Sequence, residues 1–281
     1  MNKLILLFIS TFFTLTVFGQ TETNKKYDTA LIFTNEQYDS TAFELVEKKY
    51  QIVIDHQLAD YNVYNAIGLR LATYKKYKES IPYLQKSINL KNDFTDSHFN
   101  LANACMGLDV PDSVIKYAKN ALALFQKAET AILIAECYTE KRDYRNAIIY
   151  YELANKIEPN RLYNLKPLLK LCVRTGNKKA NEITKKYFDL KPDGTNVYQE
   201  LFNIYLYYHK MDELIEFFKE QLAIYKDDKK VLGYLNFYLG NLHLQIDKKE
   251  LAKQYFLNAL NNSSNEINKG IEAGIKLAEH R

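Results

Sequence analysis

The chain has 281 residues, of which 47% are hydrophobic and 14% aromatic, so it carries enough apolar surface for an ordered core and is not a disordered chain. Proline (5) and glycine (9) are scarce, which favours long helices over many short strands. The net charge of +4 comes from 38 basic and 34 acidic residues without a dense basic run, which argues against a nucleic-acid binder.

The first residues have the pattern of an export signal. Lys3 precedes an uninterrupted apolar and hydroxyl run from Leu4 to Phe18, and Gly19-Gln20 follow it. This stretch resembles a bacterial secretory signal peptide over residues 1–19, and cleavage would leave Gln20 as the first mature residue. An uncleaved anchor helix is the alternative, although the run is shorter than the roughly 20 residues that a membrane span needs. The sequence therefore predicts an exported chain, periplasmic or secreted, with no membrane span after cleavage.

The next segments lead into a periodic region. Residues 20–26 are expected to form a short linker. Residues 27–60 are expected to form an atypical helical hairpin, because Thr41, Leu45 and Ile52 fall on one helix face after a predicted turn. An atypical end unit is what an array of repeats needs in order to cap its first repeat.

From residue 61, two consecutive helical patterns make one helix–turn–helix unit. Tyr64, Ile67 and Leu71 share one helix face with Gly68 beside them, and a second apolar face follows after a turn. The unit recurs at a period of 33 or 34 residues, since Gly68 is matched by Ala102 and then by Ala135. The predicted units are 61–94, 95–127, 128–160, 161–194, 195–232 and 233–265.

One unit carries its small and aromatic residues in a nearly complete pattern. These residues are Ile134, Ala135, Tyr138, Ala147, Tyr151, Ala154 and Pro159. The pattern resembles that of the tetratricopeptide repeat family. The resemblance implies an all-α fold, a right-handed α-solenoid of stacked helix–turn–helix repeats. Small residues belong at the closest helix approaches, where a large side chain would push the backbones apart.

Two units depart from this pattern. The fourth and fifth units have Leu168 and Phe202 where Gly or Ala is expected, and Tyr187 and Gln221 at usual Ala positions of the second helix. We therefore expect altered helix crossing there. The amphipathic residues 266–281 are predicted to form a C-terminal capping helix over the last repeat.

The sequence contains no recognisable catalytic or metal-binding pattern. The five histidines are dispersed, and there is no Gly-rich phosphate loop or nucleophile motif. Cys105, Cys137 and Cys172 fall in apolar helical patterns, which favours a role as small buried hydrophobes. The sequence predicts a protein that is not an enzyme and needs no cofactor or metal.

The family resemblance also implies a binding surface. In tetratricopeptide repeats the first helices line a concave groove for peptides or partner helices. Carried over by register, that surface comprises Asn65, Phe99, Asn103, Glu136, Gln199, Asn203, Tyr207, Phe237 and Asn241. An Asn side chain offers both donor and acceptor to a peptide backbone, and its alternative role is a solvated position on the helix face. Tyr207 belongs to an aromatic cluster that either contacts a partner or packs on the next repeat.

These patterns lead to two hypotheses for function. The first is a non-catalytic scaffold or adaptor in the bacterial cell envelope, which binds a protein or peptide partner in its groove. The alternative is a structural spacer of an envelope complex, which could self-associate. Neither hypothesis involves nucleic acid.

Overall fold

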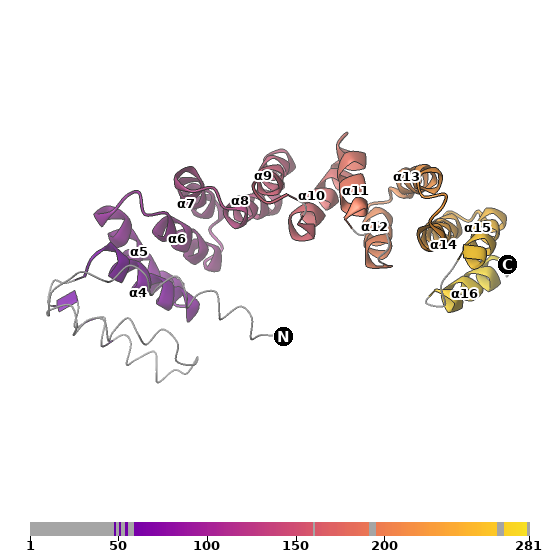
Figure 1. Cartoon of the computed structure of the whole chain (residues 1–281). Helices are drawn as coiled ribbons and strands as arrows, with labels where there is room; N and C mark the ends of the chain where they lie inside the picture. Colours follow the sequence, from indigo (N-terminus) through magenta and orange to yellow (C-terminus); the bar gives the residue numbers. More distant parts are fainter. Residues whose placement is uncertain are drawn as a thin grey trace. The chain divides into compact units, whose positions relative to one another are not determined.

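The computed structural model describes residues 59–159, 161–190, 195–262 and 267–279, and besides these Lys48, Gln51, Ile54 and Asp55 (Figure 1). This part of the chain folds into thirteen α-helices and contains no strand, which confirms the predicted all-α helical repeat. The handedness of the array stays a prediction. The expected signal peptide, the linker and most of the N-terminal hairpin lie outside the described residues.

The chain divides into two compact units, Met1–Val110 and Pro111–Arg281. The division falls inside the predicted second repeat, 95–127, so the two helices of that repeat are described with different units. The first unit contains the helices α4 (Tyr61–Thr73), α5 (Tyr77–Leu90) and α6 (Thr95–Gly107).

The helices of the first unit are joined by a close approach of α4 to α5 and by buried hydrogen bonds that link α5 to α4 and α6. A Cβ atom at Gly68 on α4 would lie 2.4 Å from Cγ of Leu84 on α5, so only glycine allows this approach. Ser87 on α5 forms a hydrogen bond of 2.6 Å with Ser97 on α6 and donates another of 2.6 Å to the carbonyl of Tyr61. Because Ser87 and Ser97 are fully buried, these bonds satisfy groups that would otherwise destabilise the packing.

The described residues of the second unit form ten helices, and successive helices pack on one another. They are α7 (Pro111–Leu124), α8 (Ala128–Glu140), α9 (Tyr144–Ile157), α10 (Leu162–Thr175), α11 (Ala180–Asp189), α12 (Thr195–Tyr207), α13 (Met211–Ile224), α14 (Lys229–Gln245), α15 (Lys249–Asn262) and α16 (Asn268–Glu279).

Six hairpins of the described residues end their first helix with the same backbone cap. Just beyond each of these first helices, a single residue has φ between 55° and 62°, in the left-handed region. The backbone amide of the next residue donates to the carbonyl oxygen five residues before that amide, at 2.8–3.2 Å. This is the Schellman motif, which satisfies carbonyls that a helix end leaves unpaired. The left-handed residues are Lys75, Asp109, Arg142, Gly176, His209 and Asp247. Five of the six are not glycine, so the motif recurs although the side chain at this position does not.

The fourth and fifth predicted units are filled by aromatic side chains in place of small residues. Phe188 on α11 packs edge-on against Tyr198 on α12 and Phe217 on α13, with ring centroids 5.4 Å and 5.7 Å apart. Tyr187 and Gln221 are buried at positions where Ala is usual. Larger side chains therefore lie between these helices at positions where small residues are usual, and the altered helix crossing stays a prediction.

The C-terminal helix α16 packs against α14 and α15. The buried ring of Phe256 on α15 is the common contact, since a Cβ at Gly240 on α14 or at Gly274 on α16 would come within 2.7 Å and 2.5 Å of it. Ile271 of α16 is fully buried in the same cluster. The helix therefore covers apolar surface of α14 and α15.

Candidate functional site: the surface of the first helices

The first helices of the second unit present a row of polar and aromatic side chains, which we call the first-helix surface. It comprises the predicted residues Glu136 on α8, Gln199, Asn203 and Tyr207 on α12, and Phe237 and Asn241 on α14. Glu136, Gln199, Asn203 and Tyr207 are exposed, whereas Phe237 and Asn241 are half-buried. The remaining predicted residues, Asn65, Phe99 and Asn103, belong to the first unit.

The amide side chains of α12 are connected to each other and to α14. Gln199 Nε2 donates to Asn203 Oδ1 at 2.9 Å, and the hydroxyl of Tyr238 on α14 donates to Gln199 Oε1 at 3.1 Å. Burial, followed by repulsion from Tyr234, raises the pKa of Tyr238 to about 12, so its hydroxyl stays protonated and remains a donor. The network holds the Asn203 amide in place while leaving its amino group exposed to a ligand.

The tyrosines at the end of α12 point in different directions. Tyr205 is buried, and its hydroxyl forms a hydrogen bond of 2.7 Å with Thr184 on α11. Tyr207 is 76% exposed, and its ring lies edge-on to Tyr208 at 4.9 Å. A ring so exposed offers apolar area and a hydroxyl to a partner.

Glu136 carries a carboxylate whose ionisation the surrounding protein opposes. Burial raises its pKa above the usual value, and repulsion from Glu140, one helical turn away, adds to this effect. Its side chain nonetheless reaches solvent from α8. A cationic or hydrogen-bond-donating group from a partner would relieve both effects.

The two predicted residues of α14 are more engaged in packing. The ring of Phe237 lies 5.1 Å from Tyr238 and 6.1 Å from Phe256, and a Cβ at Gly270 of α16 would lie 3.0 Å from it. Asn241 Nδ2 donates to the Phe237 carbonyl at 3.0 Å within the same helix. Helix α16 therefore covers part of the Phe237 ring on the first-helix surface.

In the first unit, the predicted residues divide between packing and exposure. The side-chain oxygen of Asn65 on α4 accepts from Ser97 Oγ at 3.1 Å and from Asn100 Nδ2 at 2.9 Å, so Asn65 joins α4 to α6. Phe99 is half-buried on α6, and Asn103 on the same helix is exposed.

One polar cluster beside this surface was not predicted. Lys166 on α10 forms an ion pair of 2.5 Å with Glu200 on α12, and the hydroxyl of Tyr187 on α11 donates to the same carboxylate. The spacing of 34 residues between Lys166 and Glu200 is one repeat, and opposite charges at this spacing were a usable signal. The cluster fixes α12 against the fourth predicted repeat.

The three cysteines of the described residues are buried free thiols. Cys105, Cys137 and Cys172 are buried, and burial raises the pKa of Cys137 and Cys172 to about 11, which keeps both as thiols at neutral pH. No group of three or more potential metal ligands is found among the described residues. Nor does any described helix combine the length and apolar character that a membrane crossing requires.

Comparison with known proteins supports the repeat type. Residues 128–161 match the family described as tetratricopeptide repeat. A search of curated proteins finds no match.

Solved structures of similar fold include a tetratricopeptide repeat protein from Parabacteroides merdae ATCC 43184, which is 14% identical with a TM-score of 0.52, and the match covers 91% of this chain and 100% of that one. YrrB, a TPR protein with an unusual peptide-binding site, is 12% identical with a TM-score of 0.50, covering 65% of this chain and 95% of that one. The structure of Naa15/Naa10 bound to HypK-THB is 14% identical with a TM-score of 0.53, and the match covers 92% of this chain and 39% of that one. The family match identifies residues 128–161 as a tetratricopeptide repeat, and the solved structures share the all-α helical repeat fold of this chain.

Proposed function

We propose that this chain is a non-catalytic scaffold of the bacterial cell envelope that holds a partner peptide or helix along its first-helix surface. The observation that carries the proposal is the exposure of Asn203 and Tyr207 on α12, beside a network that fixes the amide positions. The exposed amino group of Asn203 next to an exposed ring suits recognition of a peptide carbonyl and one apolar side chain.

The charge at Glu136 supports the same proposal. Its carboxylate is exposed on α8 and its pKa is raised by burial and then by Glu140, so a basic group of a partner would favour the ionised form. We expect the partner segment to place a basic or amide group over α8 and an apolar group against Tyr207.

Site-specific photo-crosslinking tests this surface. A benzoylphenylalanine at position 207 is expected to capture a discrete partner in native cells, whereas the same residue at position 224 on α13 is the control, because Ile224 is 60% exposed on a second helix. Asn203→Ala is expected to reduce the crosslink from position 207, and Asn181→Ala on α11 is not. Equal capture from positions 207 and 224 would contradict the proposal.

The envelope location is tested separately. We expect the mature protein in the envelope fraction to begin at Gln20, as N-terminal sequencing would determine. A chain that keeps residues 1–19 and stays in the cytoplasmic fraction would disprove this part of the proposal without affecting the binding surface.

A second candidate is the self-associating spacer. Leu257 on α15 and Leu277 on α16 are 44% and 63% exposed, which leaves apolar side chains on the surface near the C-terminal cap. If self-association is the function, light scattering will show a mass that rises with concentration and falls back to the monomer in Leu277→Glu. A monomer at all concentrations favours the adaptor.

A further inference from the structure

A cleft of about 370 Å³ lies between the second helix α9 and the turn that joins α10 to α11. Ile148 and Ile149 of α9 supply apolar lining, and Ile149 is 49% exposed. Tyr144 and Thr175 line it as well. None of these residues belongs to the first-helix surface, so the cleft is a separate feature of the molecule.

Basic groups lie on both sides of the cleft. Arg145 lines it from α9, and Lys179 lines it from the start of α11. The guanidinium carbon of Arg174 stands 4.4 Å from the centre of the Tyr144 ring, and an arginine stacked in this way keeps N–H groups at its edge for a carboxylate. The single acidic residue in the lining is Glu152.

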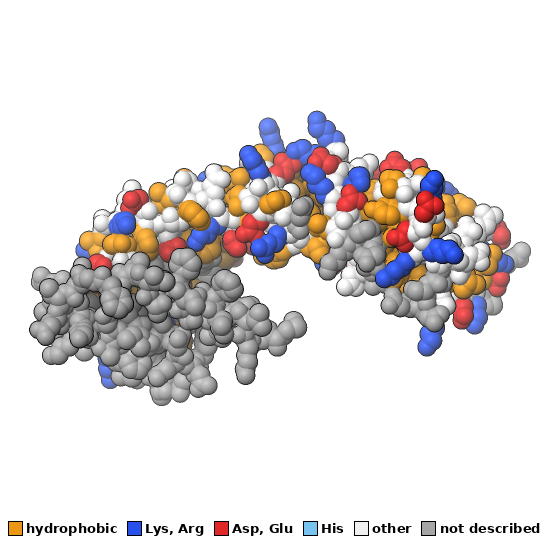
Figure 2. Space-filling view, viewed as in Figure 1, with side chains coloured by type: hydrophobic (Ala, Val, Ile, Leu, Met, Phe, Trp, Pro, Cys, Tyr) orange, Lys and Arg blue, Asp and Glu red, His pale blue; other side chains and the backbone are white. Residues whose placement is uncertain are grey.

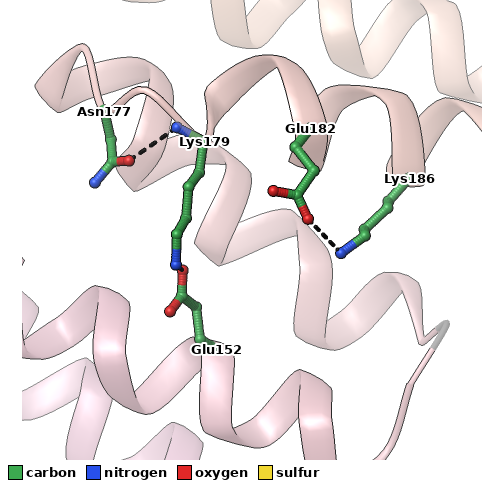
Figure 3. A network of polar contacts seen from close by, with 5 residues as sticks. All are labelled: Glu152, Asn177, Lys179, Glu182 and Lys186. Carbon is green, nitrogen blue, oxygen red and sulfur yellow. Dashed lines mark hydrogen bonds and ion pairs between the residues drawn. The ribbon is translucent and has the colours of Figure 1, made fainter.

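Lys179 is held at the rim by two contacts (Figure 3). Its Nζ donates to Glu152 at 2.5 Å, and its backbone amide donates to Asn177 Oδ1 at 3.0 Å. The ion pair uses one donor of the ammonium and leaves others, and the bond to Asn177 Oδ1 leaves the amino group of that side chain as a further donor. The rim therefore offers more donors than acceptors.

The same charge excess is visible on the surface. Figure 2 shows Lys and Arg side chains, with fewer acidic ones, gathered along the upper edge of the view over α9 to α11. Arg145, Arg174 and Lys178 are all exposed. A ligand that fits an apolar floor and this rim carries negative charge beside an aliphatic or aromatic side chain.

We propose that this cleft is a second docking site, which binds an acidic segment of a partner protein with one apolar side chain against Ile148 and Ile149 and carboxylates on Arg145, Arg174 and Lys179. A protein segment is favoured because the basic groups come from two separate elements on opposite sides of the cleft and match more than one carboxylate along an extended chain.

The test uses a library of short random peptides displayed on phage, selected on the immobilised full chain and on its Arg145→Glu variant in parallel. Peptides retained only by the unchanged protein are expected to be enriched in Asp and Glu next to Leu, Ile or Phe. An enriched peptide, measured by fluorescence anisotropy, is expected to bind roughly tenfold more weakly to Arg145→Glu and to Ile149→Ala.

Two control variants show whether binding depends on the cleft itself. Lys226→Glu makes the same charge change on an exposed residue of the α13–α14 turn, and Asn203→Ala alters the first-helix surface. Neither control is expected to change the affinity by more than about twofold. Circular dichroism would show that each variant stays folded.

Several outcomes would overturn the proposal. These are a selected set without acidic enrichment, a selected set that is basic, equal weakening by Arg145→Glu and Lys226→Glu, and no effect of Ile149→Ala. Loss of binding in Asn203→Ala alone would assign the peptides to the first-helix surface and reject the cleft.

Discussion

The residues with positive φ that end the first helices adopt the same backbone conformation at different conformational free energies. At Gly176 the φ of 62° is free of strain, because no Cβ is present and nothing lies within 4 Å of where one would be. At Arg142 a side chain occupies the same conformation, with a φ of 60°. A residue other than glycine in this region costs about 1 kcal/mol.

We expect Gly176→Ala to lower the free energy of unfolding by about 1 kcal/mol, because alanine must take the left-handed conformation. Arg142→Ala is the matched control, since that position already bears the cost, and its effect should stay within about 0.5 kcal/mol. Urea denaturation of both variants measures the difference. Equal effects at the two positions would show that the turn, and not the side chain, sets the energy.

Glu136 gives a prediction about pH. Its pKa is raised in the folded protein, so ionisation favours the unfolded chain, and the loss of stability develops as pH rises through the unfolded and then the folded pKa. Glu136→Gln is therefore expected to stabilise the protein at neutral pH but not in acid below the unfolded pKa. Thermal unfolding across that range checks the sign, and a stabilisation that is independent of pH would contradict it.

At the scale of helices, Phe256 shows how three elements depend on one ring. It is fully buried on α15, against glycines on α14 and α16 that leave no side chain to fill its place. We expect Phe256→Ala to cost about 3–5 kcal/mol, because the cavity cannot close from either neighbouring helix. Phe125→Ala, at a residue that is 57% exposed, is expected to cost much less in the same denaturation experiment.

A structural feature of the helices could be predicted where it requires a particular type of side chain, and not where it requires only a backbone conformation. Gly68 and Ala135 were identifiable because a close helix approach excludes large side chains whatever lies around them. The Schellman caps were not, since Lys75, Asp109 and Arg142 share a backbone conformation but no side chain. The cleft beside α9 was not identifiable either, because it is formed by two elements of different repeats.

The candidate site was predictable only as a set of positions. Asn203 and Tyr207, which the repeat spacing assigns to the binding surface, are exposed on α12, and their role in binding stays a prediction. Repeat spacing did not predict that the side-chain oxygen of Asn65 accepts hydrogen bonds from Ser97 and Asn100. Hydrogen bonding between helices of different repeats depends on how far each side chain reaches. The Tyr238 contact with Gln199 was missed for the same reason.

For the whole molecule, the relevant feature is helix α16, which packs against the rings of Phe237 and Phe256. A chain that lacks residues 266–281 is expected to expose the rings of Phe237 and Phe256, to lose stability and to associate. Light scattering and thermal unfolding measure both effects. Lys253→Ala, which removes only the ion pair of 2.7 Å with Glu279, is the control and should change stability by about 1 kcal/mol or less.

The recurring cap also places one comparable amide in each of six described hairpins, at Lys76, Val110, Asp143, Asn177, Lys210 and Lys248. Each amide is shielded from solvent exchange only while its own turn is closed. Six chemically similar probes, spaced along the sequence, would therefore record by hydrogen–deuterium exchange which hairpins open first and whether a bound partner closes them.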